Sequence, residues 1–163
     1  MNIDPEQLNR LQFLSRVVQR ERRHLLTTDQ RVFSKPFTPA RASSLADNID
    51  EAERVEAFVS RFGRLQDTLG DKLLPLYLEA VGERLGAAID NLDRAEKLRL
   101  IPSTDGWLTM RKLRNQMVHE YIEDAVILAD ALQAGHEFAP TLSAVVENIL
   151  ADMRARGWSD AKG

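Results

Sequence analysis

The chain has 163 residues, of which 44% are hydrophobic and 29% are charged, and its formal net charge is −3. This length suits a single domain, and the acidic balance argues against a nucleic-acid binder that works through overall positive charge. The absence of cysteine excludes a disulfide framework, a thiol nucleophile and a zinc site built on thiolates.

The N-terminal region predicts a basic helix. Asp4 can cap a helix and Pro5 suits its first position, so the pair is a start signal. Residues 10–41 hold eight basic residues and only two acidic ones, which makes this part of the chain strongly positive. We expect an N-terminal helix within residues 1–33, as an addition to the main bundle.

A connection follows this helix. Residues 34–44 contain Pro36 and Pro39 among small and polar residues, and proline removes a backbone donor and restricts the residue before it. We therefore expect a loop here and the core of the bundle at residues 45–157, with the whole chain forming one all-helical domain.

The middle of the chain repeats apolar residues at helical spacing. A second long helix is predicted by Leu45, Ile49, Ala52, Val55, Val59, Phe62, Leu65 and Leu69. Gly70 and Pro75 predict a kink or break after it. Two shorter helices are expected beyond this point, over residues 76–81 and 86–97.

The C-terminal third predicts two further helices. The first extends from about residue 104 to 133 and is expected to end at Gly135, and the second covers about 137–156. No useful length of the chain alternates with period two, so no strands are expected. The fold class is therefore all-α: an antiparallel helical bundle of the four-helix type with an extra N-terminal helix.

Several classes of protein find no support in the sequence. No stretch approaches about 18 consecutive apolar residues, and the N-terminus lacks a basic region followed by an apolar one. We therefore expect a cytoplasmic protein without membrane contact. The chain also lacks a phosphate-binding loop, a glycine-rich dinucleotide loop and paired metal-binding histidines, so we expect neither cofactor nor metal.

Polar residues gather in one stretch of the predicted helix 104–133. Arg114 and Tyr121 are seven positions apart and share a face, as do Asn115 and His119, which are four apart. Arg114 and His119, however, are separated by about 140° around the axis. One straight helix does not direct both at the same substrate atom, whereas two copies across a two-fold axis could. This geometry favours a homodimer with a composite site.

Arg114, His119 and Tyr121 resemble the R-x4-H-x-Y signature of HEPN-domain toxins, in particular the HepT branch, and Asn115 fits it as well. The resemblance implies an all-α dimer that cleaves RNA without metal or cofactor, with Arg114 and His119 as the catalytic pair. It also implies a partner, an antitoxin of the MNT nucleotidyltransferase type. Tyr121 would then accept the AMP groups by which this antitoxin silences the toxin.

Other residues are candidates for a supporting role. HEPN proteins often carry a further polar or acidic residue on an earlier helix, and Glu56 and Asp67 are candidates for it. Arg22 and Arg23 are candidates for RNA binding together with Asn115, because phosphate contacts come mainly from arginine and lysine. The two arginines also fit a solvated helix face.

The residue types suit RNA cleavage, because RNA carries its own nucleophile, the 2′-hydroxyl. A histidine such as His119 can move protons near neutral pH, and the guanidinium of Arg114 matches phosphate oxygens. The alternative is a non-catalytic module that binds a nucleotide or a nucleotidyltransferase, with Arg114, His119 and Tyr121 lining a pocket. A plain structural dimer, in which these residues only fix the interface, is a third reading.

Overall fold

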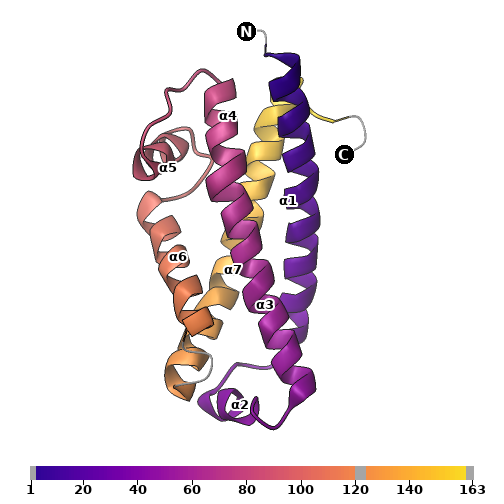
Figure 1. The fold of residues 1–163 in the computed structure, drawn as a ribbon, viewed down its shortest axis with the longest axis vertical. Helices are drawn as coiled ribbons and strands as arrows, with labels where there is room; N and C mark the ends of the chain where they lie inside the picture. Colours follow the sequence, from indigo (N-terminus) through magenta and orange to yellow (C-terminus); the bar gives the residue numbers. More distant parts are fainter. Residues whose placement is uncertain (1–2, 120–123, 161–163) are drawn as a thin grey trace.

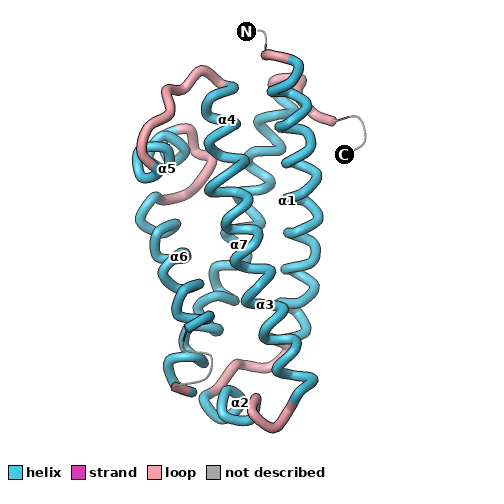
Figure 2. Tube along the Cα trace, viewed as in Figure 1, coloured by secondary structure: helices cyan, strands magenta, loops and turns pink. Residues whose placement is uncertain are grey.

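The computed structural model describes residues 3–119 and 124–160, and this part of the chain is helical, without strands (Figures 1 and 2). The predicted all-α fold class is therefore confirmed. In chain order the elements are α1 (Pro5–Val32), α2 (Pro39–Ser44), α3 (Ile49–Asp67), the π-helix η1 (Thr68–Leu73), α4 (Leu74–Ala80), α5 (Ala88–Lys97), α6 (Thr104–His119) and α7 (Ala125–Ala155).

Four long helices form an up-and-down bundle. Helix α3 lies between α1 and α6, and α7 packs against α1 and α6 behind it (Figure 1). Successive long helices run in opposite directions. The α1–α7 face and the α3–α6 face are consequently on opposite sides of the molecule. Helix α5 lies at the side of α4, next to the start of α6.

One hydrophobic core runs through the bundle and includes α1. Leu11, Leu14, Val18 and Leu25 of α1 are buried and belong to the same cluster as the buried residues of α3, α6 and α7. The core is therefore not confined to the expected residues 45–157. The structure instead makes α1 one of the four packed helices, because its apolar stripe faces α3 and α7.

The predicted break at Gly70 and Pro75 takes the form of a π-helix. The helical path continues from α3 through η1 into α4, and Pro75 lies in the first turn of α4, directly after the π-helical segment. The start of α3 is capped by Asn48, whose side chain accepts a hydrogen bond from the amide of Glu51 (3.1 Å). The predicted loop at 34–44 contains the short helix α2, capped by Thr38.

The predicted helix over 104–133 is wrong in its extent. Helix α6 ends at His119, and α7 begins at Ala125, where the Asp124 carboxylate accepts hydrogen bonds from the amides of Val126 (3.0 Å) and Ile127 (3.1 Å). Gly135 does not end a helix. It is buried inside α7, which continues past it.

Pro140 also lies inside α7. Proline in a helix interior removes one hydrogen bond and crowds the preceding turn, yet α7 continues through the exposed Pro140, with Ala139 and Leu142 buried on either side of it. Among residues 3–119 and 124–160, no helix combines the length and apolar character that a bilayer crossing needs.

Candidate functional site

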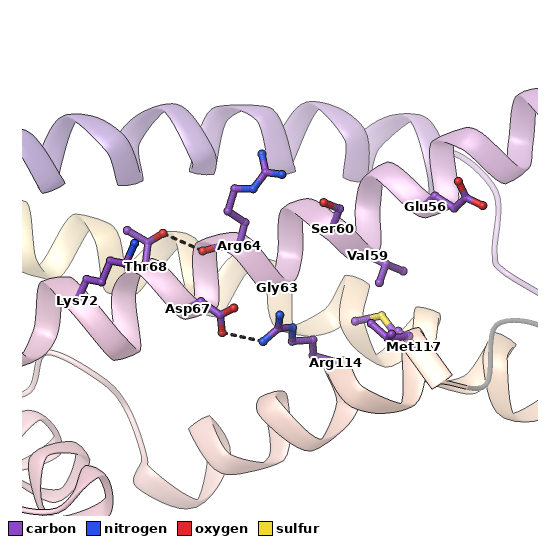
Figure 3. A pocket seen from close by; sticks show the side chains of 11 residues that line it. Glu56, Val59, Ser60, Gly63, Arg64, Asp67, Thr68, Lys72, Arg114 and Met117 are labelled. Atoms are coloured by element: carbon purple, nitrogen blue, oxygen red, sulfur yellow. Dashed lines mark hydrogen bonds and ion pairs between the residues drawn. The ribbon is translucent and has the colours of Figure 1, made fainter.

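A cleft of about 620 Å³ follows the outward side of α3 and η1 and reaches α6 (Figure 3). The floor of the cleft contains two small residues of α3, Ser60 and Gly63, which fill little space. Charged side chains stand along its rims. The lining residues are Glu56, Val59, Ser60, Gly63, Arg64, Asp67, Thr68, Lys72, Arg114, Met117 and Val118.

Arg114 enters this cleft from α6 and lies directly against α3. A Cβ atom placed on Gly63 would be 2.5 Å from Arg114 Nε, so the glycine leaves the space that the arginine occupies. Arg114 Nη1 donates a hydrogen bond to Oδ1 of Asp67 over 2.7 Å (Figure 3). The two side chains are 32% and 42% exposed, which leaves the ion pair accessible to a ligand in the cleft.

A second contact between a glycine and a large side chain of α6 fixes how α6 lies against α3 and η1. Gly70 of η1 faces Trp107, and a Cβ there would be 3.0 Å from the indole nitrogen. The two glycines are seven residues apart, as are Trp107 and Arg114, so two large side chains of α6 each cover one glycine. Trp107 is fully buried, as expected for a core residue. The antiparallel pairing therefore sets where Arg114 lies along the cleft.

The rim of the cleft away from α6 is formed by Arg64, Thr68 and Lys72. Behind it lies Glu21 of α1, whose carboxylate accepts a hydrogen bond from the Thr68 hydroxyl (2.8 Å). Burial raises the pKa of Glu21 above its ordinary value, although the Thr68 hydrogen bond and the charges of Arg64 and Lys72 act in the opposite direction.

The motif residues on α6 have different places. Arg114 lines the cleft, whereas Asn115 is exposed and is not among the residues that line it. His119 is the last residue of α6, one position after Val118 of the cleft, and its side chain lies outside the described part of the structure. Tyr121 lies outside the described residues altogether.

Arg22 and Arg23 are not brought to this cleft. They line a separate groove between α1 and α7, on the side of the bundle opposite the α3–α6 face. Arg22 forms an ion pair with Glu147 of α7. The structure therefore separates these two predicted RNA contacts from Arg114 within one chain.

The structure distinguishes the two candidate acidic residues. Asp67 contacts Arg114 directly, whereas Glu56 lies on the lining of the same cleft about 11 residues earlier, without a described ion pair. Sequence reasoning did not find Gly63, Arg64 or Lys72. Gly63 is the residue in the sequence that could have indicated this site, because glycine in a helix interior is unfavourable unless close packing requires it.

Within the described residues, no group of three or more histidine, aspartate or glutamate side chains is arranged to hold a metal ion. No protein-family model, curated protein or solved structure matches this chain significantly.

Proposed function

We propose that this protein is a metal-independent endoribonuclease of the HEPN toxin type, with Arg114 and His119 as its catalytic pair. The observation that carries the proposal is the placement of Arg114. Gly63 and Asp67 position its guanidinium in the cleft of about 620 Å³, five residues before His119 in α6. A fixed cation in an accessible recess suits a phosphate that gains charge during reaction.

The reaction would use the 2′-hydroxyl of the substrate. His119 removes its proton while the O2′–P bond forms, and the guanidinium of Arg114 stabilises the charge on the phosphorane. The P–O5′ bond then breaks, and the 5′-oxygen receives a proton from a protonated histidine. The products are a 2′,3′-cyclic phosphate and a 5′-hydroxyl, and no metal takes part.

We further propose that the active unit is a cytoplasmic homodimer. Exposed apolar side chains lie within the motif and shortly after it. They are Val118 at the end of α6 and Val126 and Ile127 at the start of α7, and these are 52%, 55% and 42% exposed. A second copy would cover them and would bring His119 of one chain toward Arg114 of the other.

Control by an MNT-type nucleotidyltransferase antitoxin completes the proposal. The Tyr121 hydroxyl oxygen would form a bond to the α-phosphorus of ATP, its proton would pass to solvent, and pyrophosphate would leave. The added negative charge, seven residues after Arg114 in the chain, would repel an RNA phosphate.

The experiment compares expression of the chain alone with expression of Arg114→Ala and His119→Ala. We expect growth arrest for the natural chain and its relief by either substitution. Purified protein should cleave RNA in the presence of EDTA and leave 2′,3′-cyclic phosphate ends. Arg111→Ala is a matched control, because Arg111 is also on α6 and forms an ion pair with Asp71 of η1 (3.3 Å). A harmless natural chain whose dimer leaves RNA intact would contradict the proposal.

One observation favours a second candidate, the non-catalytic nucleotide- or partner-binding module. The Asp67 carboxylate already compensates the charge of Arg114, which suits a binding site better than transition-state stabilisation. In that case Arg114→Ala would weaken binding of ATP or the antitoxin, while no preparation of the natural chain would cleave RNA.

A further inference from the structure

We propose that Arg64 and Lys72 form a phosphate-binding subsite that holds a single strand of RNA along the cleft, next to Arg114. This inference rests on the proposed ribonuclease function, because it names the form of the substrate at the same site. It assigns binding to two residues that the α6 motif does not contain.

The first support is the pairing of charges around the cleft. The guanidinium of Arg114 is already paired with Asp67. Arg64 and Lys72 are exposed, and neither side chain has an ion pair or hydrogen bond among residues 3–119 and 124–160. Their charges act on the half-buried Glu21 of α1, but no carboxylate of the described residues forms a direct ion pair with either of them. Two accessible cations on one rim are suited to contact phosphate oxygens.

The second support is their common position on the rim. Arg64 and Lys72 are eight residues apart, which is at most about 12 Å along the helix axis, and Thr68 lies between them (Figure 3). Glu21 is the acidic group that faces this rim from α1, and its carboxylate is engaged by the Thr68 hydroxyl. The spacing of the two cations favours a ligand with several phosphates, such as a strand lying lengthwise.

The third support is the apolar lining at the opposite end. Val59 and Val118 line the cleft there, and apolar surface can take the face of an unstacked base. In a duplex the bases are stacked inside the helix, so they do not reach such a surface. The half-buried guanidinium of Arg114 lies in a recess that a flexible strand enters more readily than a rigid double helix.

The test measures binding separately from cleavage. A fluorescent 2′-O-methyl RNA oligonucleotide lacks the nucleophile, so its binding to the full chain can be followed by anisotropy over a range of salt concentrations. We expect Arg64→Gln/Lys72→Gln to weaken binding about tenfold or more. It should also reduce the steepness of the salt dependence, by roughly 0.7 per lost phosphate contact for a single strand.

The matched control is Arg84→Gln/Lys97→Gln. It removes one arginine and one lysine that are exposed at the α5 end of the molecule and line none of the described clefts. This variant should bind like the natural chain. A blunt duplex of the same sequence should bind clearly more weakly than the single strand.

The outcomes separate the two proposals. If Arg64→Gln/Lys72→Gln and its control bind equally, or if the duplex binds as well as the single strand, the subsite is wrong even where unmodified RNA is cleaved. If binding falls as expected but the natural chain never cleaves unmodified RNA, the subsite stands and the ribonuclease proposal fails. In an active enzyme we expect KM to rise for Arg64→Gln/Lys72→Gln with little change in kcat.

Discussion

Arg114 lies in the space that Gly63 leaves free on α3, since a Cβ at that glycine would be only 2.5 Å from Arg114 Nε. The arginine is thereby placed in the cleft by a residue 51 positions earlier in the chain. The atoms in question are at the far end of a flexible side chain, so a substitution at Gly63 would move the guanidinium and leave the backbone in place.

Gly63→Ala is therefore expected to separate activity from stability. Alanine in a helix interior gains up to about 1 kcal/mol over glycine, so the melting temperature should hold or rise slightly. The displaced guanidinium should lower kcat for RNA cleavage by about tenfold or more. Gly106→Ala is the control, because a Cβ there meets neighbours only at 3.5 Å or more. Equal kcat values for the two variants would argue against this positioning role.

Gly70→Ala should behave in the opposite way. Its Cβ would lie 3.0 to 3.3 Å from atoms of the Trp107 ring, which is fully buried and has no room to withdraw. Overpacking of this kind costs about 1–3 kcal/mol. Urea unfolding should therefore show a clear loss of stability, and an unchanged midpoint would mean that α6 can shift along η1.

Glu21 predicts a pH dependence of stability. Because burial raises the pKa of this carboxyl above its ordinary value of 4.5, folding favours the protonated form. Its contribution to stability is fully present below 4.5 and is lost as the pH rises through the folded-state pKa. Glu21→Gln should thus be more stable than the natural chain at pH 7, with a smaller difference at pH 4. Glu79→Gln, at an exposed position of α4, should lack this trend.

The composite dimer predicts complementation between two inactive variants. If each site takes its arginine from one chain and its histidine from the other, mixed dimers of Arg114→Ala and His119→Ala contain one intact site. Equal mixing after subunit exchange should restore about a quarter of the natural activity, because half of the dimers are mixed and each has one of two sites. A mixture that stays inactive would place both residues of a site in the same chain.

The sequence predicted the helical class well because that class depends on local spacing of apolar residues. The prediction is wrong at Gly135, because glycine can either end a helix or permit close packing inside one. Gly135 has the appearance of a helix stop, yet a Cβ there would be 3.1 Å from Met117 Sδ and 3.2 Å from Phe58 Cε1, so the glycine permits close packing inside α7. The sequence does not reveal the start of α7, because the apolar spacing of the predicted helix continues on both sides of the capping residue Asp124.

The candidate site was predictable only in part for a similar reason. Arg114 stands in a short local motif, and local motifs can be read from one sequence. Its neighbours Asp67 and Gly63 are distant in the chain and reach it through the antiparallel packing of α3 and α6. Arg64 and Lys72 belong to an ordinary charged helix surface, and only the hollow beside them distinguishes them from other exposed cations.

The pairing of Trp107 with Gly70 has a consequence for engineering this molecule. The buried indole is about 10 Å along α6 from Arg114. Its contact with Gly70 nevertheless fixes how far α6 is shifted along α3 and η1, and so where Arg114 lies. Changes to the core around Trp107 would displace the site as a unit. Ser60 and Glu56, on the lining but outside the two glycine contacts, are the positions where ligand preference can be altered while the helix register is kept.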